Sequence, residues 1–225
     1  MKNNIRAAKA VSIIMSVIMA LGMCSCGKKS GKVSVRAGDT VMFGTYEGRK
    51  IEWIVLDTGK NGALLITKEG LDVKQMDDET EFIEYIWEDC DLHAWLNGGF
   101  YETSFSDDEK KQINKTAVRF EKSPSKAAMA RDGQDTEDYV FLLSYSEAKK
   151  YFRSDEARMC PVSSKAKANG GFEGYNGNCK WWLRTNSAYK NSFLVVNEKG
   201  HIEENKGMTC YAEDICIRPV MWVSI

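Results

Sequence analysis

The N-terminal segment constrains this chain most, because it determines where the rest of the protein has to fold. Positive charges at Lys2, Arg6 and Lys9 precede an apolar run over residues 10–23. At about 14 residues, this run has the length of a signal-peptide apolar core and is shorter than the roughly 20 residues of a transmembrane helix. The sequence therefore predicts an exported protein with residues 1–26 as its signal peptide.

The end of the apolar run predicts lipid attachment at Cys26. Cys26 follows the small Ser25, as a signal peptidase requires, whereas Cys24 follows the bulky Met23. Acyl chains contribute about 0.8 kcal/mol per buried methylene, so a multiply acylated cysteine holds a domain on a membrane. We expect an extracytoplasmic protein whose partner is the cell membrane, through this lipid anchor. Plain secretion and an uncleaved anchor are the alternatives.

The remaining chain predicts a short tether and one globular domain. Residues 27–38 are rich in Gly, Lys, Ser and Val and predict a flexible tether. A hydrophobic fraction of 43% and an aromatic fraction of 11% indicate that residues 39–225 form a packed domain. Removing three positive charges with the signal changes the formal charge from −1 to −4. This balance gives no reason to expect a nucleic-acid partner.

Short segments of strand and helix character predict an α+β fold, a compact mixed domain with short antiparallel strands and a few short helices. The expected strands are residues 40–43, 51–57, 63–67, 139–143, 193–197, 201–204 and 215–223. Segment 51–57 is too apolar for one solvated face, which predicts a central strand. Pro219 places the last strand at a sheet edge or next to a bulge.

Helical patterns occupy the middle of the domain. Apolar residues three and four apart within 87–105 predict a half-buried helix that Gly98 and Gly99 interrupt. Capping boxes that begin at Ser106 and Ser144 predict the starts of two further helices.

Cysteine positions leave the disulfide pattern open. The cysteines after the lipidation site are Cys90, Cys160, Cys179, Cys210 and Cys216. Disulfides form in exported proteins, and the most local of three pairings joins Cys160 to Cys179 and Cys210 to Cys216. Cys90 is then a buried thiol. Unpaired thiols throughout are the alternative.

Motifs spread along the domain occur together in one order. They are Phe43-Gly44-x-Tyr46, Ile51-Glu52-Trp53-x-Val55-Leu56, Ala63-Leu64-Leu65, Trp87-x-x-Cys90-x-Leu92-x-x-Trp95-Leu96-Asn97, Phe100-Tyr101, Phe105-Ser106, Val140-Phe141-Leu142-Leu143-Ser144, Glu147-Ala148, Trp181-Trp182-Leu183-Arg184 and Ile217-Arg218-Pro219-x-x-Trp222. This set resembles the domain of unknown function 6273 over residues 39–225. The resemblance implies an exported or surface-associated domain of Gram-positive anaerobes, often behind a lipoprotein signal, and no established activity. His93 departs from the family, which usually has an arginine before its Trp-Leu-Asn.

The C-terminal third carries a second resemblance. Its Trp-Trp-Leu-Arg block, the following hairpin and the Arg-Pro strand are similar to the C-type-lectin-like fold of sulfatase-modifying proteins. This likeness implies a C-type-lectin-like course for that part of the chain.

Trp181, Trp182 and Arg184 are the candidate ligand-binding residues, beside a glycine- and aromatic-rich loop at residues 169–179. Aromatic faces stack on sugars or cations, and arginine offers a planar fork for carboxylates. Such a platform would bind a cell-wall glycan, a peptide or a protein. The alternative is core packing, because adjacent strand residues point to opposite faces.

The acidic segment 69–91 contains ten acids and one lysine. Calcium takes six to eight oxygens, but the spacing matches no EF-hand loop. A solvated acidic face is the alternative, and calcium binding stays open.

No catalytic set emerges from the sequence, and no cofactor is expected. Cys90 and His93 have half of a zinc-ligand spacing without a second half. Cys210 and Cys216 invite comparison with the reactive pair of formylglycine-generating enzymes, but nearby acids oppose a thiolate. We therefore expect a non-catalytic binding lipoprotein. A sulfatase-modifying-type enzyme using a cysteine or a metal, and a structural envelope domain, are the alternatives.

Overall fold

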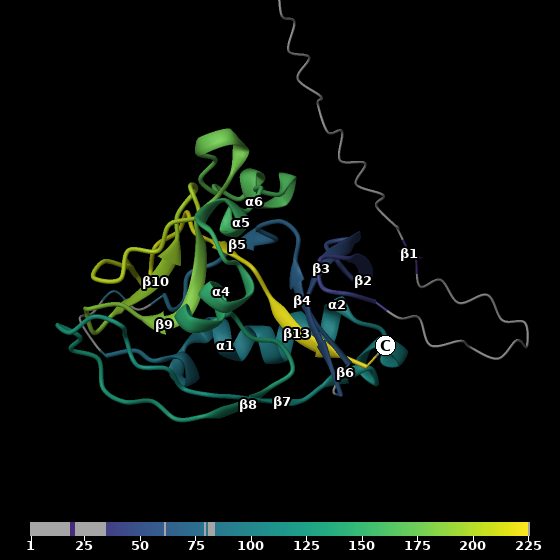
Figure 1. The fold of residues 1–225 in the computed structure, drawn as a ribbon, viewed down its shortest axis with the longest axis horizontal. Coiled ribbons are helices and arrows are strands. Elements are labelled where there is room, and N and C mark those ends of the chain that lie inside the picture. Colours follow the sequence, from purple (N-terminus) through teal and green to yellow (C-terminus); the bar gives the residue numbers. More distant parts are fainter. Residues whose placement is uncertain (1–18, 21–34, 61, 79, 81–83, 225) are drawn as a thin grey trace, which may run out of the picture.

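The computed structural model describes residues 19–20, 35–60, 62–78, 80 and 84–224 (Figure 1). Its strands are β1 (Met19–Ala20), β2 (Thr40–Tyr46), β3 (Arg49–Gly59), β4 (Gly62–Thr67), β5 (Asp72–Val73), β6 (Ile113–Asn114), β7 (Thr116–Val118), β8 (Thr136–Asp138), β9 (Trp181–Asn186), β10 (Ser192–Val196), β11 (Met208–Thr209), β12 (Cys216–Ile217) and β13 (Val220–Val223). Its helices are η1 (Trp87–Asp89), α1 (Asp91–Trp95), η2 (Leu96–Phe100), α2 (Tyr101–Ser104), α3 (Asp107–Lys110), α4 (Tyr145–Tyr151), α5 (Asp155–Arg158), α6 (Ser164–Ala168) and η3 (Tyr175–Gly177). Apart from β1, the predicted signal peptide with Cys26 lies outside the described residues, as do residues 27–34 of the predicted tether.

The first sheet has the strand order β1-β2-β3-β4-β13-β6. Antiparallel pairing joins β2 to β3 and β3 to β4, which confirms that segment 51–57 is central. Ile51, Trp53 and Val55 are buried along β3 and alternate with less buried neighbours, as the two-residue period of a strand requires. Gly38 donates its backbone N–H to the Val55 carbonyl over 2.8 Å, so the last part of the predicted tether is bonded to this sheet.

The second sheet has the order β11-β10-β9-β12-β5. All six residues of β9 are buried, and this strand pairs with β10 antiparallel and with β12 parallel. The partner strand expected at 201–204 is reduced to a bridge between Val196 and Ile202. β7 and β8 pair separately as a small antiparallel ribbon.

The C-terminal strand joins the two sheets. Its first half, β12, lies between β9 and β5, and its second half, β13, lies between β4 and β6. Pro219 stands between the halves, where its missing N–H ends one ladder. The expected edge position is therefore corrected, because both halves are central and the proline marks the change of sheet (Figure 1).

The helical segment 87–105 breaks at the extended Cys90 and then runs from α1 to α2 without the interruption expected at the glycines. Gly98 and Gly99 lie in η2, a π-helical turn that continues directly into α2. Their missing side chains weaken the helix locally but do not end it.

Both predicted capping boxes are present. Ser106 accepts the backbone N–H of Glu109, and Glu109 accepts that of Ser106. Ser144 and Glu147 make the same reciprocal pair at the start of α4. Each box satisfies backbone N–H groups that the first helical turn leaves free.

The predicted strand 139–143 does not form. The Asn97 side-chain oxygen accepts the backbone N–H groups of Tyr139 and Val140 over 2.8 and 3.2 Å, and its amide donates to the Val140 carbonyl over 2.9 Å. These backbone groups are thus satisfied by a side chain instead of a strand partner. Within this segment, Phe141 makes the one β-bridge, to Val220.

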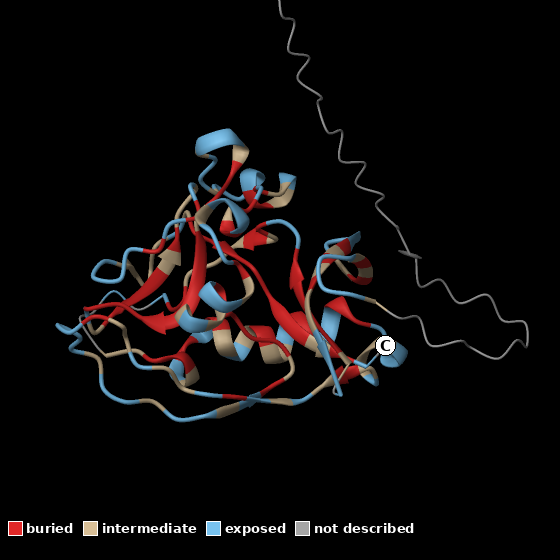
Figure 2. Ribbon diagram, in the orientation of Figure 1, coloured by how far each residue is buried: buried red, intermediate tan, exposed pale blue. Residues whose placement is uncertain are grey.

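The two mainly antiparallel sheets and the short helices confirm a compact α+β domain. Buried residues follow β4, β9, β10 and β13 over most of their length (Figure 2). None of the helices in the described part of the chain is long and apolar enough to cross a membrane.

Replacing Gly200 by alanine is expected to lower the free energy of unfolding by more than about 2 kcal/mol. Gly200 has φ +79°, and a Cβ there would lie 1.6 Å from the Asp155 carbonyl oxygen. Gly48→Ala is the matched control, because Gly48 has φ +76° but nothing within 4 Å of its Cβ position. Urea unfolding measures both losses, and equal losses would contradict the importance of this contact.

Candidate functional site

The three residues predicted to form a ligand platform lie in the interior. Trp181 and Trp182 have no exposed surface, and Arg184 is 6% exposed. The Trp181 indole N–H donates to the Arg158 carbonyl over 3.1 Å, and that of Trp182 donates to the Lys74 carbonyl over 2.8 Å. The expected platform is corrected, because rings covered on both faces cannot stack on a ligand. Their burial supports the alternative, core packing.

A buried ion pair holds Arg184. Its Nη1 and Nη2 atoms donate to the two carboxylate oxygens of Glu147 over 2.5 and 3.0 Å, and Nη1 also donates to the Leu142 carbonyl over 2.6 Å. Burial alone would raise the pKa of Glu147, but the hydrogen bonds and charge of Arg184 outweigh it and hold this pKa below its ordinary value. The guanidinium therefore ties α4 to β9 and has no free fork for a ligand.

The described cysteines are all buried, and none of them is disulfide-bonded in this structure. The Cys210 carbonyl accepts the Met76 N–H, whereas Cys216 pairs with Val73 in β5. Val73 and Met76 are three residues apart in the chain, so Cys210 and Cys216 contact different parts of this segment. The local pairing of Cys210 with Cys216 thus finds no support in this geometry, whereas Cys160 and Cys179 are neighbours, since Cys179 donates its N–H to the Cys160 carbonyl over 2.8 Å.

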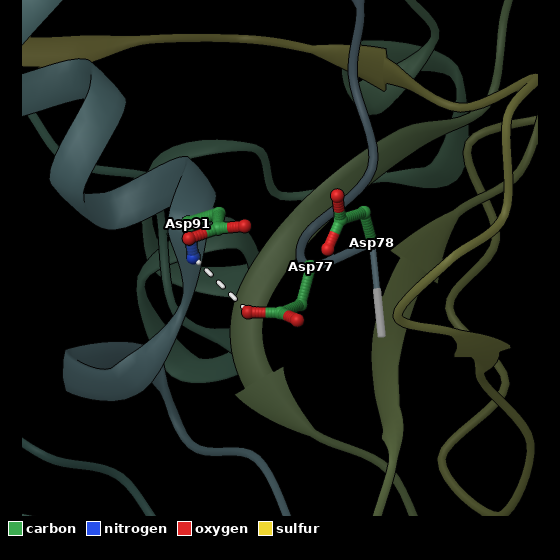
Figure 3. A group of neighbouring side chains, drawn as sticks. All are labelled: Asp77, Asp78 and Asp91. Carbon is green, nitrogen blue, oxygen red and sulfur yellow. Dashed lines mark hydrogen bonds between the residues drawn. The ribbon is translucent and has the colours of Figure 1, made fainter. Parts of the chain in front are cut away.

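An open cleft of about 450 Å³ lies where the segment after β5 passes the start of α1. Its lining residues are Val73, Lys74, Gln75, Asp77, Asp78, Asp91, Leu92, Trp95 and Glu213, and we call it the acidic cleft. Asp77, Asp78 and Asp91 each offer a carboxylate oxygen, and these oxygens lie within 4.8 Å of one another. Figure 3 shows the three side chains, with Asp91 at the start of the helix and the other two on the facing segment.

Backbone hydrogen bonds hold the two walls of the acidic cleft together. Asp77 accepts the Asp91 N–H over 3.2 Å (Figure 3), and Leu92 donates to the Met76 carbonyl over 3.0 Å. Met76 and Asp77 both donate their N–H groups to the Cys210 carbonyl, over 2.8 and 3.2 Å. The segment that carries the acids is therefore clamped between α1 and Cys210.

The neighbouring carboxylates disfavour the ionisation of Asp91. Burial and the neighbouring charges of Asp77 and Asp78 raise the pKa of Asp91 above its ordinary value. Asp77 is 6% exposed and Glu213 adds a fourth acid at the rim, while Lys74 is the one basic residue of the lining. A positive charge entering the cleft would relieve this repulsion.

Trp95 is the aromatic residue of the acidic cleft lining and carries a lysine ammonium, and Phe172, which is not part of the lining, carries another. Lys74 Nζ lies 4.3 Å from the centroid of the Trp95 ring, and Lys180 Nζ lies 4.5 Å from that of Phe172. Phe172, in the glycine-rich loop, is 38% exposed and donates its N–H to the Asp214 carbonyl over 3.2 Å. Ring faces attract cations, and both of these faces are occupied by lysines of the chain itself.

The acidic cleft can hold positive charge in two chemical forms. Calcium takes six to eight oxygen ligands, of which three aspartates supply part. A protonated amine or a guanidinium of a peptide can contact several carboxylates and a ring face together. The acids belong to the segment 69–91, in which Glu79 and Glu81 lie outside the described residues.

Cys90 and His93 do not form a metal site. The Cys90 thiol donates to the Ile86 carbonyl over 3.2 Å, and burial raises its pKa. His93 Nε2 lies 2.8 Å from one carboxylate oxygen of Asp138, and the other oxygen accepts the Trp87 indole N–H over 3.1 Å. Within the described ranges, the three aspartates of the cleft are the one group with metal-ligand spacing.

Trp95 is the site residue that sequence reasoning missed, because its spacing assigned it to the buried helix face. It is only half-buried, and it follows Asp91 by four residues. Residues four apart share one face of a helix, so the pair of an acid and an aromatic residue was the available signal.

The sequence model of the family described as "Domain of unknown function (DUF6273)" matches residues 60–225. The match begins after β3 and includes every residue that lines the acidic cleft. No curated protein and no solved structure matches the chain.

Replacing Arg184 by methionine is expected to lower the free energy of unfolding at pH 7 by about 2–3 kcal/mol, because the Glu147 carboxylate, whose side chain is 33% exposed, keeps only its bond from the Ser144 N–H. Urea unfolding measures the loss. A loss below about 1 kcal/mol, the value of an exposed ion pair, would contradict a structural role for Arg184.

The pH dependence of the Glu147→Gln variant is the companion measurement. Because the folded pKa of Glu147 lies below its unfolded value, the ionised carboxylate stabilises the fold above the unfolded pKa. This stabilisation is lost as the pH falls through the folded pKa. The stability gap between wild type and variant should be full at pH 7 and close in acid, and a gap independent of pH would contradict the assignment.

Proposed function

Because the chain belongs to the family of the domain of unknown function DUF6273, whose description names no activity, we propose a function from its own residues: a lipid-anchored extracytoplasmic domain that binds a positively charged peptide or protein segment in the acidic cleft. The single observation that carries the binding role is the convergence of Asp77, Asp78 and Asp91 in an open cleft. The binding role is non-catalytic.

The N-terminal sequence supports the anchored setting. Its positive start, short apolar run and Ser25-Cys26 pair are what a lipoprotein signal needs. A lipid on Cys26 and a tether would hold the cleft at the outer face of the membrane of a Gram-positive bacterium. The ligand would then be met in the cell envelope.

The shape and charge of the acidic cleft support a basic segment as the ligand. An open cleft admits one or two side chains of a longer chain, and its carboxylates match lysine or arginine. The Trp95 face would bind the incoming cation after Lys74 moves away, because one ring face takes one cation at a time.

The proposal also includes a C-type-lectin-like fold for the C-terminal third of the domain. A C-type-lectin-like course of the C-terminal third is supported by the central strand β9, with the hairpin strand β10 beside it. A glycan ligand would follow from that likeness, but the acidic cleft favours a cation.

The enzyme alternative has less support. A thiolate nucleophile needs access to substrate, and both Cys210 and Cys216 have no exposed surface. A purely structural role in the envelope predicts that the acidic cleft binds no ligand. Binding of the peptide in the experiment below would contradict that role, and absence of binding would support it.

Replacing Cys26 by serine is expected to abolish labelling of the protein by radioactive palmitate in growing cells. Cys24→Ser is the matched control and should keep the label, because Met23 before Cys24 is too large for a lipoprotein signal. Labelling that survives Cys26→Ser, or an unlabelled wild-type protein in the cytosol, would contradict the anchored setting.

Replacing Asp78 and Asp91 together by asparagine is expected to weaken binding of a fluorescent hexalysine peptide about tenfold, which corresponds to about 1.4 kcal/mol. Fluorescence anisotropy measures the dissociation constant, and binding should weaken with added salt. Competition by calcium chloride shows whether the ion binds at the same carboxylates.

The matched control replaces Glu203 and Glu204 by glutamine. These exposed neighbours carry the same charge but lie outside the lining of the cleft. The control should bind hexalysine within about twofold of wild type, because surface charges at a distance are largely screened. Equal binding by all three proteins, or no binding by wild type, would overturn the proposed site.

A further inference from the structure

Three buried cysteines converge around one glycine. A Cβ at Gly70 would lie 2.6 Å from Cys179 Sγ and 2.9 Å from Cys216 Sγ, so only a residue without a side chain leaves room for these sulfurs. Cys160 is the third member, because its thiol and that of Cys179 both approach the Pro161 carbonyl oxygen. All three have no exposed surface.

Strand register places Cys160 and Cys179 directly opposite each other. The antiparallel bridge joins Pro161 to Asn178, so the residues before and after this pair face each other. Cys179 donates its N–H to the Cys160 carbonyl over 2.8 Å, which is one of the two bonds of a hydrogen-bonded pair. The Cα atoms of such a pair lie about 5.5 Å apart, in the middle of the range that a disulfide needs.

The sulfur atoms of Cys160 and Cys179 also lie close to the same backbone carbonyl oxygen. The Cys160 thiol lies 3.6 Å from the Pro161 carbonyl oxygen, and the Cys179 thiol lies 4.0 Å from the same oxygen. Both side chains therefore leave the bridge on the same side, which is the orientation that a disulfide requires.

Cys216 is less well placed for a bond with Cys179. In the parallel pair of β12 with β9, its register partner is Trp181, two residues after Cys179. Diagonal neighbours of this kind lie about 7–8 Å apart at Cα, which is beyond the usual limit for a disulfide. The sulfur of Cys216 lies near that of Cys179, but the backbones of the two residues are too far apart for a disulfide.

A buried cation next to the thiols is the second observation. Arg218 is 2% exposed, its charge acts on both Cys160 and Cys179, and its Nη1 atom has no hydrogen-bond partner among the described residues. Its charge lowers the pKa of the Cys160 thiol, but burial has the larger effect and raises it.

We infer that Cys160 and Cys179 are joined by a disulfide in the exported protein, with Cys90, Cys210 and Cys216 as thiols. The reactant is an external low-molecular-weight or protein disulfide. One cysteine thiolate attacks it and releases a thiol, and the second cysteine then displaces the other half. One S–S bond forms in the protein, one external S–S bond is reduced to two thiols, and these take the two protons.

The exchange has to precede the final packing of the second sheet. Burial raises the pKa of the Cys160 thiol well above its ordinary value, so the folded protein holds a protonated, covered sulfur. The bond therefore forms while the chain folds outside the cytoplasm. The inferred disulfide therefore rests on the proposed export, and the experiment tests the disulfide and the export separately.

Peptide mass spectrometry tests the pairing. The full chain is isolated from cells without reductant and alkylated in denaturant, and a linked peptide of Cys160 and Cys179 is expected beside alkylated Cys90, Cys210 and Cys216. Reduction should lower the thermal midpoint by about 5–10 °C, since the bond closes a short loop. Cys179→Ser should release Cys160 as an alkylated thiol, while Cys210→Ser should leave the linked peptide unchanged.

Refolding of the reduced full chain with oxidised glutathione distinguishes the pairing from export. A linked Cys160–Cys179 peptide after refolding but not from cells would support the pairing and count against export. Alkylation of all five domain cysteines after refolding would overturn the inference. So would a bond from Cys179 to Cys216 or from Cys210 to Cys216.

Discussion

The passage of the C-terminal strand from one sheet to the other is the constraint on which the structure depends. Arg218 donates its Nε–H to the Thr67 carbonyl over 2.9 Å, and the Pro219 carbonyl accepts the Thr67 N–H over 3.1 Å. The guanidinium lies 5.0 Å from the ring centroids of both Phe152 and Trp181, which partly replaces the water it has lost. One dipeptide thus joins the end of β4 to the centre of the second sheet.

This junction also determines the geometry of the acidic cleft. β12 pairs with β5, and the segment that leaves β5 carries the acids of the cleft. Trp182, which the sequence suggested as a ligand platform, instead donates its indole N–H to the Lys74 carbonyl at the cleft wall. A core side chain therefore acts on the candidate site by fixing the backbone from which Lys74 reaches the Trp95 ring.

Local signals in the sequence were enough for the elements that local chemistry determines. The capping boxes at Ser106 and Ser144 depend on contacts three residues apart, and the central position of segment 51–57 follows from its apolar content. Contacts between residues far apart in the sequence determine the features that the sequence did not predict. The Asn97 side chain removed a strand at 139–143, and Pro219 became a change of sheet because both flanking halves found partners more than 100 residues away. The cleft needed β5 and α1 to meet, which no periodicity reveals.

Amide hydrogen exchange in the native protein tests most directly whether the Arg218–Pro219 junction makes the two sheets one cooperative unit. The Cys216 amide donates to the Lys180 carbonyl in the second sheet, and the Val220 amide donates to the Phe141 carbonyl beside the first. Both amides should exchange with the same free energy of opening, close to that of global unfolding. In an Arg218→Lys variant, this free energy should fall by the same amount at both amides. Loss of protection at Cys216 with full protection retained at Val220 would show that the sheets open separately and would contradict the account.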